Sequence, residues 1–599
     1  MTDTTVEETV SALALAEPHH DGSELYVLER PGELGGTAVV RMRAPRAAAD
    51  RVVLRYVCDG EPRTAEAVVD EEADGETWWR AELPVENPVV RYRWLLSGGE
   101  AGYGWLNGRG VFPDEVPGSD DFVFALETGG PAWHRSSVVY EIFADRFATS
   151  GIVDTVSKPD WAVRRDWDQL PEGRGRNTSG ELFGGDLPGI EQHLDHVESL
   201  GANVIYLTPF FPAGSTHRYD ASSFTRVDPL LGGDEALASL IKAVHGRGMR
   251  VVGDLTLNHC GAGHEWFLRA EADAAAPERE LFFFDGSLPL GYVAWLGVRS
   301  LPKLNWTSQE LRRRMGAAMR RWLDEGLDGW RIDVANMVGR YRWLDLNHEV
   351  AAWARELAGN RLLLAEHGHD FRPDIDGLGW HGVMNYAGFL RPTWWWLSGD
   401  AITEDVFSSA PAPRYGGVEM VSVMREFRAG VPWEAALNSW TLLDSHDTAR
   451  FRTVAGSRDR HVVGVGLQMT TPGVPMIFAG DEIGLEGEWG EDARRTMPWD
   501  RPESWDGTLL AHFRELAALR RSHEALASGG LRYVHVGDDA VAYLRETRDE
   551  RLLCLAARAP HDPIRVPFTQ LETLYGGDAR NGVLPADGPA FHVWRISNG

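Results

Sequence analysis

Two kinds of hydrophobic pattern divide the chain. Between about Leu25 and Phe124, apolar and polar residues alternate in short runs separated by glycine, proline and acidic residues; the clearest runs span 37–45, 51–59, 77–85 and 89–97. Alternation with period two, broken in this way, is typical of half-buried β-strands. We therefore expect an N-terminal β-sandwich over residues 25–125, preceded by a flexible segment over 1–24.

From Val138 onward, continuous apolar runs alternate with stretches whose apolar residues recur every three or four positions. Eight runs are strand candidates: VVYEIF (138–143), NVIYLTPF (203–210), RVVGDLTLNH (250–259), GWRIDV (329–334), RLLLAEH (361–367), GVMNY (382–386), SWTLLDSHD (439–447) and VPMIFAGDE (474–482). Alternating strands and amphipathic helices predict a parallel sheet, and eight units predict a closed (β/α)8 barrel. We expect this TIM barrel over 136–520, with a short insertion over 260–305 after its third strand.

The β pattern returns near the C-terminus, in runs over 531–537, 540–546, 551–558 and 591–597. A small C-terminal β domain is therefore predicted over 521–599. The predicted fold class is α/β, a TIM barrel flanked by two β domains.

Composition narrows the function classes. A formal net charge of −29 over 599 residues argues against a nucleic-acid partner, because phosphate binding depends largely on lysine and arginine. Cys58, Cys260 and Cys554 are too few and too widely spaced for a disulfide framework. The first twenty residues do not resemble a signal peptide, and no apolar run is long enough to cross a bilayer. We expect a cytoplasmic protein with no membrane partner.

Polar residues recur where the predicted barrel strands end. They are Asp254, Asn258 and His259 on the third strand, Arg331 and Asp333 on the fourth, Glu366 on the fifth, and His446 and Asp447 on the seventh. Active sites of such barrels lie at the C-terminal ends of the strands, and buried acids need partners. A single pair of opposite charges could be a satisfied contact in the core. Four barrel strands that all end in charged residues or histidines predict an active site.

Clustered carboxylates without a phosphate loop favour glycoside hydrolysis, in which one carboxylate attacks and another protonates the leaving oxygen. Metal-dependent hydrolysis is the competing interpretation, since His259, His264 and Glu265 are close in sequence. The two histidines are five residues apart, however, and not the four that place two ligands on one helical face. Cys260 has no neighbouring base and is expected to be a packed thiol.

Four segments carry a resemblance to a known family. DLTLNH (254–259), GWRIDVAN (329–336), AEH (365–367) and LLDSHD (442–447) are similar, in the right order, to the four signature regions of the α-amylase family of glycoside hydrolases. LPKLN (301–305) resembles the branch that holds neopullulanases, cyclomaltodextrinases and maltogenic amylases, and GVMNYAGFLRPTWWWL (382–397) resembles maltodextrin glucosidases. The N-terminal β domain resembles the additional, carbohydrate-binding-like domain of that branch.

The resemblance implies residue roles. Asp333 would be the nucleophile, Glu366 the general acid and base, and Asp447 the stabiliser of the transition state. In retaining enzymes the two reacting carboxyls are about 5–5.5 Å apart. The residues expected to bind substrate are His217, Tyr219, Asp254, His259, Arg331 and His446. Arg331 should also hold the adjacent Asp333 carboxylate in its charged form.

The expected function is retaining hydrolysis of α-1,4-glucosidic bonds in maltodextrins, with some transglycosylation. A cyclomaltodextrinase or neopullulanase acting on cyclodextrins or pullulan is the first alternative, and a catalytically silent glucan-binding protein is the second, because a fold alone does not establish a function. The expected partner is a small oligosaccharide, and the resemblance leaves open a homodimer formed through the N-terminal domain.

Some positions depart from the family pattern. Calcium-dependent members have a histidine four residues after the nucleophile, where this chain has Met337, and the segment 145–151 lacks their Asn/Asp-rich loop. We expect no cofactor and no required calcium, although Asn258 matches one family ligand and a structural calcium ion is left open. Trp78 and Trp79 are expected in the core or an interface, and the tryptophans at 394–396 are candidate sugar platforms at the cleft rim.

Overall fold

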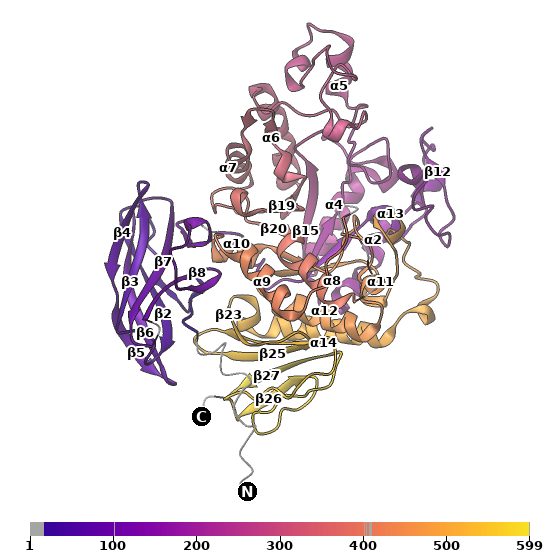
Figure 1. The fold of residues 1–599 in the computed structure, drawn as a ribbon. Coiled ribbons are helices and arrows are strands. Elements are labelled where there is room, and N and C mark those ends of the chain that lie inside the picture. The colour runs from indigo at the N-terminus through magenta and orange to yellow at the C-terminus, as the bar shows by residue number, and fades with distance from the viewer. Residues whose placement is uncertain are drawn as a thin grey trace.

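A central barrel connects two β domains in the computed structural model (Figure 1). The structure describes residues 17–100, 102–127, 129–175, 177–399, 402, 404–405 and 410–597. The N-terminal domain packs on one side of the barrel, and the C-terminal sheet lies beneath it, next to α14 (Gly507–Ser522).

The N-terminal domain is a sandwich of two antiparallel sheets. One sheet has the order β1 (Val27–Glu29), β2 (Gly36–Pro45), β6 (Glu76–Val85), β5 (Val68–Ala73). The other contains β4 (Glu61–Glu66), β3 (Arg51–Cys58), β7 (Val89–Gly98), β8 (Gly102–Asn107) and β9 (Gly110–Phe112), and β10 (Phe122–Ala125) pairs with β7. Alternate residues of β2, β3, β6 and β7 point inward, as the period-two pattern predicts, whereas β4 and β5 have no fully buried residue. Trp79 is buried in this core, and Trp78 stacks on Tyr26.

The expectation of a flexible segment over 1–24 needs a correction at its end. Residues 1–16 lie outside the described part of the chain, but residues 17–24 are packed against the sandwich and the C-terminal domain. His19 exchanges two backbone hydrogen bonds with Arg43, the buried His20 ring contacts the Tyr92 hydroxyl at 2.8 Å, and the Asp21 carboxylate accepts from the Leu531 backbone N–H at 2.8 Å. Aromatic packing and paired polar groups order this segment. These contacts could not be predicted from its composition.

The eight predicted barrel strands are confirmed. They are β11 (Val139–Ile142), β14 (Val204–Leu207), β15 (Arg250–Thr256), β16 (Gly329–Asp333), β19 (Leu362–His367), β20 (Gly382–Asn385), β21 (Trp440–Leu442) and β22 (Val474–Phe478). Each pairs in parallel with the next, and β22 pairs with β11 to close the ring. Because the strands are covered by side chains on both faces, their apolar runs are continuous.

Amphipathic helices surround the barrel. The principal ones are α2 (Leu187–Gln192), α3 (Leu194–Ser199), α4 (Gly233–Gly246), α6 (Gln309–Asp324), α7 (Asn347–Ala358), α9 (Gly417–Arg428), α10 (Trp433–Asn438) and α12 (Arg458–Thr470). Helix α6 shows how the sequence sets their bounds: the Ser308 hydroxyl accepts from the Leu311 backbone N–H at 3.1 Å, which caps the helix start. Its buried face includes Met315, Met319 and Trp322.

The insertion 260–305 forms a projection at the top of Figure 1, where α5 (Glu265–Ala272) lies. It continues through the short helices η5 (Pro277–Leu281) and η6 (Trp295–Gly297). Phe283 packs on Tyr341, at 4.8 Å between ring centres, in the hairpin formed by β17 (Arg340–Tyr341) and β18 (Leu344–Asp345). The insertion and the loop after β16 therefore build one side of the barrel mouth.

Two of the three tryptophans of 394–396 are not sugar platforms at the cleft rim. All three belong to α8 (Arg391–Leu397), which follows the π-helix η9 (Tyr386–Leu390). Trp394 and Trp396 are buried, and their indole N–H groups donate to the backbone carbonyls of Leu443 and Asp538. Trp395 is half-buried against the Tyr415 ring. For Trp394 and Trp396 the expectation was wrong, because a high density of tryptophan in a sequence does not reveal which face of a helix is covered.

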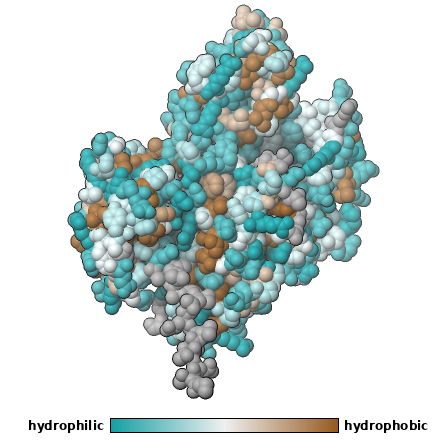
Figure 2. Space-filling view, viewed as in Figure 1, coloured by the Kyte–Doolittle hydropathy of each residue, from teal (hydrophilic) through white to brown (hydrophobic). Residues whose placement is uncertain are grey.

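The C-terminal domain is a five-stranded antiparallel sheet with the order β23 (Gly530–Val536), β24 (Ala540–Glu546), β25 (Arg551–Ala557), β27 (Ala590–Ile596), β26 (Leu571–Tyr575). Four of these strands correspond to the predicted runs. Strand β26 was not expected, since it is an edge strand without clear alternation. The face seen in Figure 2 is mainly hydrophilic with scattered hydrophobic patches. In the described part of the chain, none of the helices has the length and apolar character needed to cross a membrane.

Candidate active site

Strand register places the predicted polar residues at one end of the barrel. Asp254 on β15 lies opposite Arg331 on β16, and Thr256 lies opposite Asp333. Arg331 and Asp333 are two residues apart on one strand, so their side chains point to the same face. Glu366 follows near the end of β19, the next strand. These side chains therefore converge at the C-terminal mouth.

A single guanidinium holds three carboxylates together. Arg331 Nη1 lies 2.9 Å from Asp254 Oδ2 and 3.1 Å from Asp333 Oδ1, and Nη2 lies 2.8 Å from Glu366 Oε1. The Arg331 side chain is fully buried. The contact of Nη2 with Glu366 is close but lacks hydrogen-bond geometry, so that among the described residues Nη2 has no hydrogen-bond partner. Arg331 thus provides the positive charge that lets three acids share a buried space.

The backbone beside Asp333 is strained. Val334 has φ 37° and ψ 47°, the left-handed region that β-branched residues rarely adopt. The Val334 N–H donates to Glu366 Oε2 at 2.7 Å. Strain of this kind costs about 1–3 kcal/mol and persists where surrounding structure imposes it. The hydrogen bond from Val334 holds the Glu366 carboxyl beside Asp333.

A second network connects Tyr219, Asp254 and His446. The Tyr219 hydroxyl donates to Asp254 Oδ2 at 2.9 Å and contacts His446 Nε2 at 2.8 Å. Because the hydroxyl hydrogen is directed to Asp254, His446 Nε2 is the donor in that contact. His446 Nδ1 lies 2.5 Å from Glu141 Oε1, so both ring nitrogens donate. Burial lowers the pKa of His446, but the charges of Asp447 and Glu141 outweigh it and raise the pKa, which favours the imidazolium.

Asp447 lies between two cationic groups. Its Oδ1 is 2.8 Å from Arg494 Nη2, and its Oδ2 is 3.2 Å from His446 Nε2. Burial alone would raise the pKa of Asp447, but the charges of His446 and Arg494 dominate and lower it. Asp447 is therefore ionised at neutral pH, with part of its carboxylate exposed at the mouth.

The two remaining predicted histidines lie in the same mouth and are neutral. His259 Nε2 is 3.7 Å from Asp333 Oδ2. The His217 ring stacks beside Tyr219, with 5.8 Å between ring centres. Burial is the main reason that the pKa of each histidine falls to about 3. Neutral imidazoles can accept or donate hydrogen bonds without adding charge beside Asp333.

Asp333 and Glu366 titrate as a pair. Burial raises the pKa of both carboxyls; the charge of Glu366 raises that of Asp333 further, while Arg331 opposes the shift in both. Two carboxyls in one buried site cannot both ionise easily, so the pair retains a proton to higher pH than either acid would in water. One ionised and one protonated carboxyl is the state that such a pair favours.

The structure brings all nine predicted site residues to the mouth and adds others that the sequence did not reveal. Tyr206 donates to Asp254 Oδ2 at 2.6 Å, the Tyr386 hydroxyl contacts Ser445 Oγ at 2.9 Å, and the Trp295 ring lies 5.7 Å from His259. Glu141 could have been found, since it is a lone acid inside the apolar first strand. Arg494 lies in a loop after the eighth strand with no pattern to mark it.

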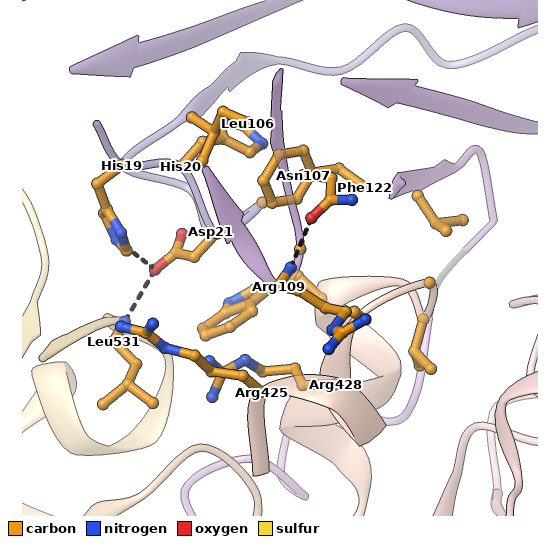
Figure 3. A pocket seen from close by; sticks show the side chains of 18 of the residues that line it. His19, His20, Asp21, Leu106, Asn107, Arg109, Phe122, Arg425, Arg428 and Leu531 are labelled. Carbon is orange, nitrogen blue, oxygen red and sulfur yellow. Dashed lines mark hydrogen bonds and ion pairs between the residues drawn. The ribbon is translucent and has the colours of Figure 1, made fainter. Parts of the chain in front are cut away.

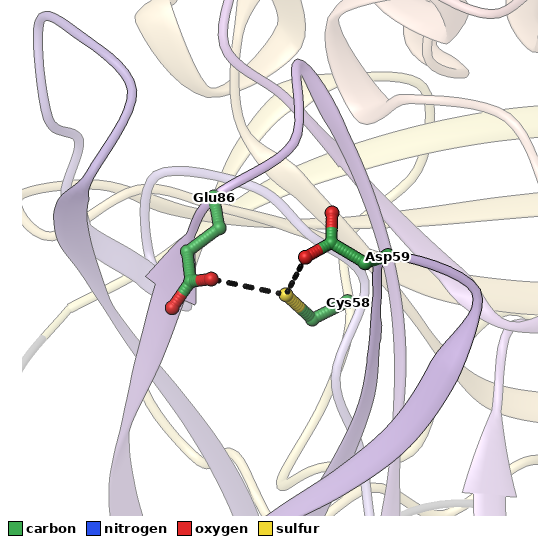
Figure 4. Close-up of side chains that lie close together, drawn as sticks. All are labelled: Cys58, Asp59 and Glu86. Atoms are coloured by element: carbon green, nitrogen blue, oxygen red, sulfur yellow. Dashed lines mark hydrogen bonds between the residues drawn. The ribbon is translucent and has the colours of Figure 1, made fainter.

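The residues considered as metal ligands, His259, His264 and Glu265, do not lie together. His264 caps α5, where its Nδ1 accepts from the Trp266 N–H at 3.1 Å, and Glu265 is exposed. In the described ranges, Cys58, Asp59 and Glu86 of the N-terminal domain are the acidic and sulfur side chains close enough to share an ion (Figure 4). Burial raises the pKa of the Cys58 thiol, which makes it a poor ligand. Cys260 is buried, as expected for a packed thiol.

The two positions related to calcium contact a lysine. Lys303 is buried, and its ammonium donates to Asn258 Oδ1 and, at 3.0 Å, to the Met337 backbone carbonyl. Burial lowers the pKa of Lys303 to about 8, so the charged form still prevails near neutral pH. A cationic side chain therefore lies between the oxygen atoms that would face a calcium ion, and these residues do not fit a calcium site.

Comparison with known proteins identifies the family. The model of the α-amylase catalytic domain matches residues 141–356 and 414–524. The chain is 30% identical over 494 residues to a cyclomaltodextrinase of Bacillus sp., covering 80% of this chain and 83% of that protein. It is 30% identical over 440 residues to an intracellular maltogenic amylase of Bacillus subtilis, covering 72% and 70%.

A solved structure has the same architecture. The type III pullulan hydrolase from Thermococcus kodakarensis superposes with a TM-score of 0.73 at 26% identity, over 96% of this chain and 99% of that one. The matched family residues include the strands that carry Asp254, Arg331 and Asp333. Together with the closed barrel and its two β domains, these matches show that the chain belongs to the α-amylase family and is an α-glucan glycoside hydrolase.

Proposed function

We propose that the protein hydrolyses α-1,4-glucosidic bonds of malto-oligosaccharides with retention of configuration. One observation carries this proposal. The Asp333 carboxyl contacts Nη1 of Arg331, and the Glu366 carboxyl contacts Nη2 of the same guanidinium. A shared guanidinium supports a short separation of the two carboxyls, which retaining enzymes require.

The contacts favour distinct roles for the two acids. Asp333 Oδ1 is held by Arg331, whereas Oδ2 lies 3.7 Å from His259 Nε2. Asp333 Oδ2 attacks the anomeric carbon and forms a β-glucosyl ester, while Glu366 gives its proton to the departing glycosidic oxygen. Glu366 then takes a proton from water, whose oxygen attacks the same carbon and releases Asp333.

Asp447 and Tyr219 complete the sugar-binding subsite in this proposal. Asp447 is ionised and partly exposed, so its carboxylate can accept hydrogen bonds from sugar hydroxyls and stabilise positive charge on the ring. Tyr219 is fixed between Asp254 and His446, which presents its aromatic face to the pyranose. His217 and His259 can bind further hydroxyls at the same position.

A second candidate substrate class is supported by the relatives. The names cyclomaltodextrinase and pullulan hydrolase belong to similar proteins that share most of this chain. Opening of cyclodextrin rings, or cleavage of pullulan, would use the same acids with a differently shaped cleft. Transfer to a sugar acceptor would need only that a sugar hydroxyl replaces water in the second step.

Product analysis separates these substrates. Purified protein is incubated with maltoheptaose, β-cyclodextrin and pullulan in parallel, with Asp333→Asn as the blank. Early glucose or maltose from the linear chain, with little from the other two, supports the malto-oligosaccharide proposal. Rapid ring opening, or panose from pullulan, would assign the second substrate class, and no product from any of them would favour a silent glucan-binding protein.

We also propose that no calcium ion is required, because the Lys303 ammonium occupies the space between Asn258 and Met337. Activity and the thermal unfolding midpoint of the purified protein should be unchanged by excess chelator. Lys303→Met should lower the midpoint by several degrees, since it leaves the buried Asn258 oxygen and the Met337 carbonyl without a donor. A loss of activity in chelator that calcium restores would contradict this proposal.

Location and assembly remain proposals. A cytoplasmic location is supported by the B. subtilis relative, which is named as intracellular. A homodimer formed through the N-terminal sandwich is proposed from the family resemblance, and analytical ultracentrifugation of the full chain would test it.

A further inference from the structure

A pocket lies where all three domains meet (Figure 3). Its walls come from the N-terminal segment, the β8–β9 hairpin, the C-terminal end of α9 with the residues that follow it, and strand β23. None of the nine site residues lines it. Its volume of about 60 Å³ has room for a few waters or one compact polar group, and not for a chain of sugar rings.

Three arginines line this pocket, and two of them lack a counter-charge. Arg109 has one distant partner, Asp120, at 3.6 Å. Arg425 and Arg428 are half-buried, and in the described part of the chain neither forms an ion pair. Arg425 instead lies over the Tyr533 ring, 4.9 Å from its centre. In a chain of net charge −29, two neighbouring unpaired arginines at a domain junction need an explanation.

The acidic residues of the pocket are fewer than its arginines. Asp21 accepts hydrogen bonds from the Ser23 and Leu531 backbone N–H groups at 2.9 and 2.8 Å and lies 3.8 Å from the His19 ring. Glu17 is on the exposed rim. His19 and His20 are neutral at pH 7, since burial lowers the pKa of each to about 4. Three arginines against the two carboxylates of Asp21 and Glu17 leave the lining of the pocket with a net positive charge.

The guanidinium groups determine which ligand the pocket can take. Half-buried arginines without a counter-charge select a compact anion with several acceptor oxygens, and arginine forks match phosphate geometry best.

We propose that this junction pocket binds the phosphate group of a small molecule, such as a phosphorylated sugar. The phosphate lies against Arg425 and Arg428 with Arg109 on the opposite wall, and the rest of the molecule projects through the open side. Because the walls belong to three domains, a ligand that binds only the assembled junction stabilises it and raises the unfolding midpoint. Phosphate binding at the junction does not depend on catalysis at the barrel mouth, so a test can contradict one of them and support the other.

Calorimetric titration of the full-length protein with inorganic phosphate and with glucose 1-phosphate tests the proposal, together with thermal unfolding. Saturable binding is expected for both, and neutral glucose should not bind at the junction. The double variant Arg425→Gln/Arg428→Gln should lose at least about tenfold in affinity, because each charge-assisted hydrogen bond contributes strongly. Arg46→Gln, an exposed arginine on the N-terminal domain, is the matched control and should bind like the unaltered protein.

Circular dichroism checks that each variant is folded. The proposal is overturned if sodium chloride at equal ionic strength shifts the midpoint as much as phosphate does, if the double variant binds phosphate as tightly as the Arg46 control, or if glucose competes with phosphate for the site.

Discussion

Asp333→Asn is expected to reduce kcat for malto-oligosaccharide hydrolysis by about 10⁴-fold or more, with the fold intact. The amide is a very poor nucleophile, and no other carboxylate can reach the anomeric carbon without losing its own contacts. The side chain keeps its shape beside Arg331, so substrate binding should change much less than kcat. Initial rates on maltoheptaose, with thermal unfolding of the same samples, measure both effects.

Asp328→Asn is the matched control for this variant. Asp328 directly precedes the strand that ends in Asp333, and it binds the His245 ring and the Val251 N–H at the opposite end of the barrel. That end of a TIM barrel contributes to stability and not to catalysis. Asp328→Asn should therefore lower the unfolding midpoint but keep kcat within a few-fold. Comparable activity in the two variants would refute the role of Asp333.

A trapped intermediate gives an independent test of retention. A fluorinated glucosyl fluoride that forms the ester quickly but hydrolyses it slowly should label the unaltered protein with one sugar, on the peptide that contains Asp333. Mass spectrometry of the digest locates the label. An inverting enzyme would form no ester, so absence of label during turnover of this reagent would contradict the proposed mechanism.

Arg331→Met should lower kcat/KM by about 10³-fold and destabilise the protein by about 3–5 kcal/mol. Without the guanidinium, Asp254, Asp333 and Glu366 remain buried together with no cation between them. Burial already raises the pKa values of Asp333 and Glu366 in the folded state, and without the opposing charge of Arg331 they rise further above those in the unfolded chain. A raised carboxyl pKa costs stability as pH increases through the ordinary range of these acids, so the deficit should be small near pH 4 and larger near pH 8.

The unfolding midpoints of Arg331→Met and the unaltered protein, compared at about pH 4 and pH 8, test this dependence. Arg331→Lys is the control for charge alone: one ammonium can restore part of the stability, but it cannot contact three carboxylates as the planar guanidinium does. Its activity should therefore remain low. A midpoint difference that is independent of pH would show that Arg331 acts by packing and not by its charge.

The sequence by itself determined the architecture. Strand and helix periods are local properties of the chain, so the eight strands, the insertion after the third and the two β domains could be predicted from them. Seven of the nine site residues could also be predicted, because they lie at or just beyond the ends of barrel strands, and the carboxyl ends of these strands must meet at one mouth. His217 and Tyr219 were predicted from the family resemblance alone. Arg331 was visible for the same reason as Asp333: a charge within an apolar run requires a partner.

Only the tertiary structure decided which groups contact one another. Glu141 and Arg494 are far from His446 and Asp447 in sequence, yet they set the charge of those residues. The strain at Val334, the Lys303 ammonium between Asn258 and Met337, and the burial of Trp394 and Trp396 likewise depend on which segments fold together. The pocket of Arg425 and Arg428 requires three domains to meet. Periodicity reports which face of an element is buried, but contacts between distant elements are fixed by packing, and packing carries no local signal in the chain.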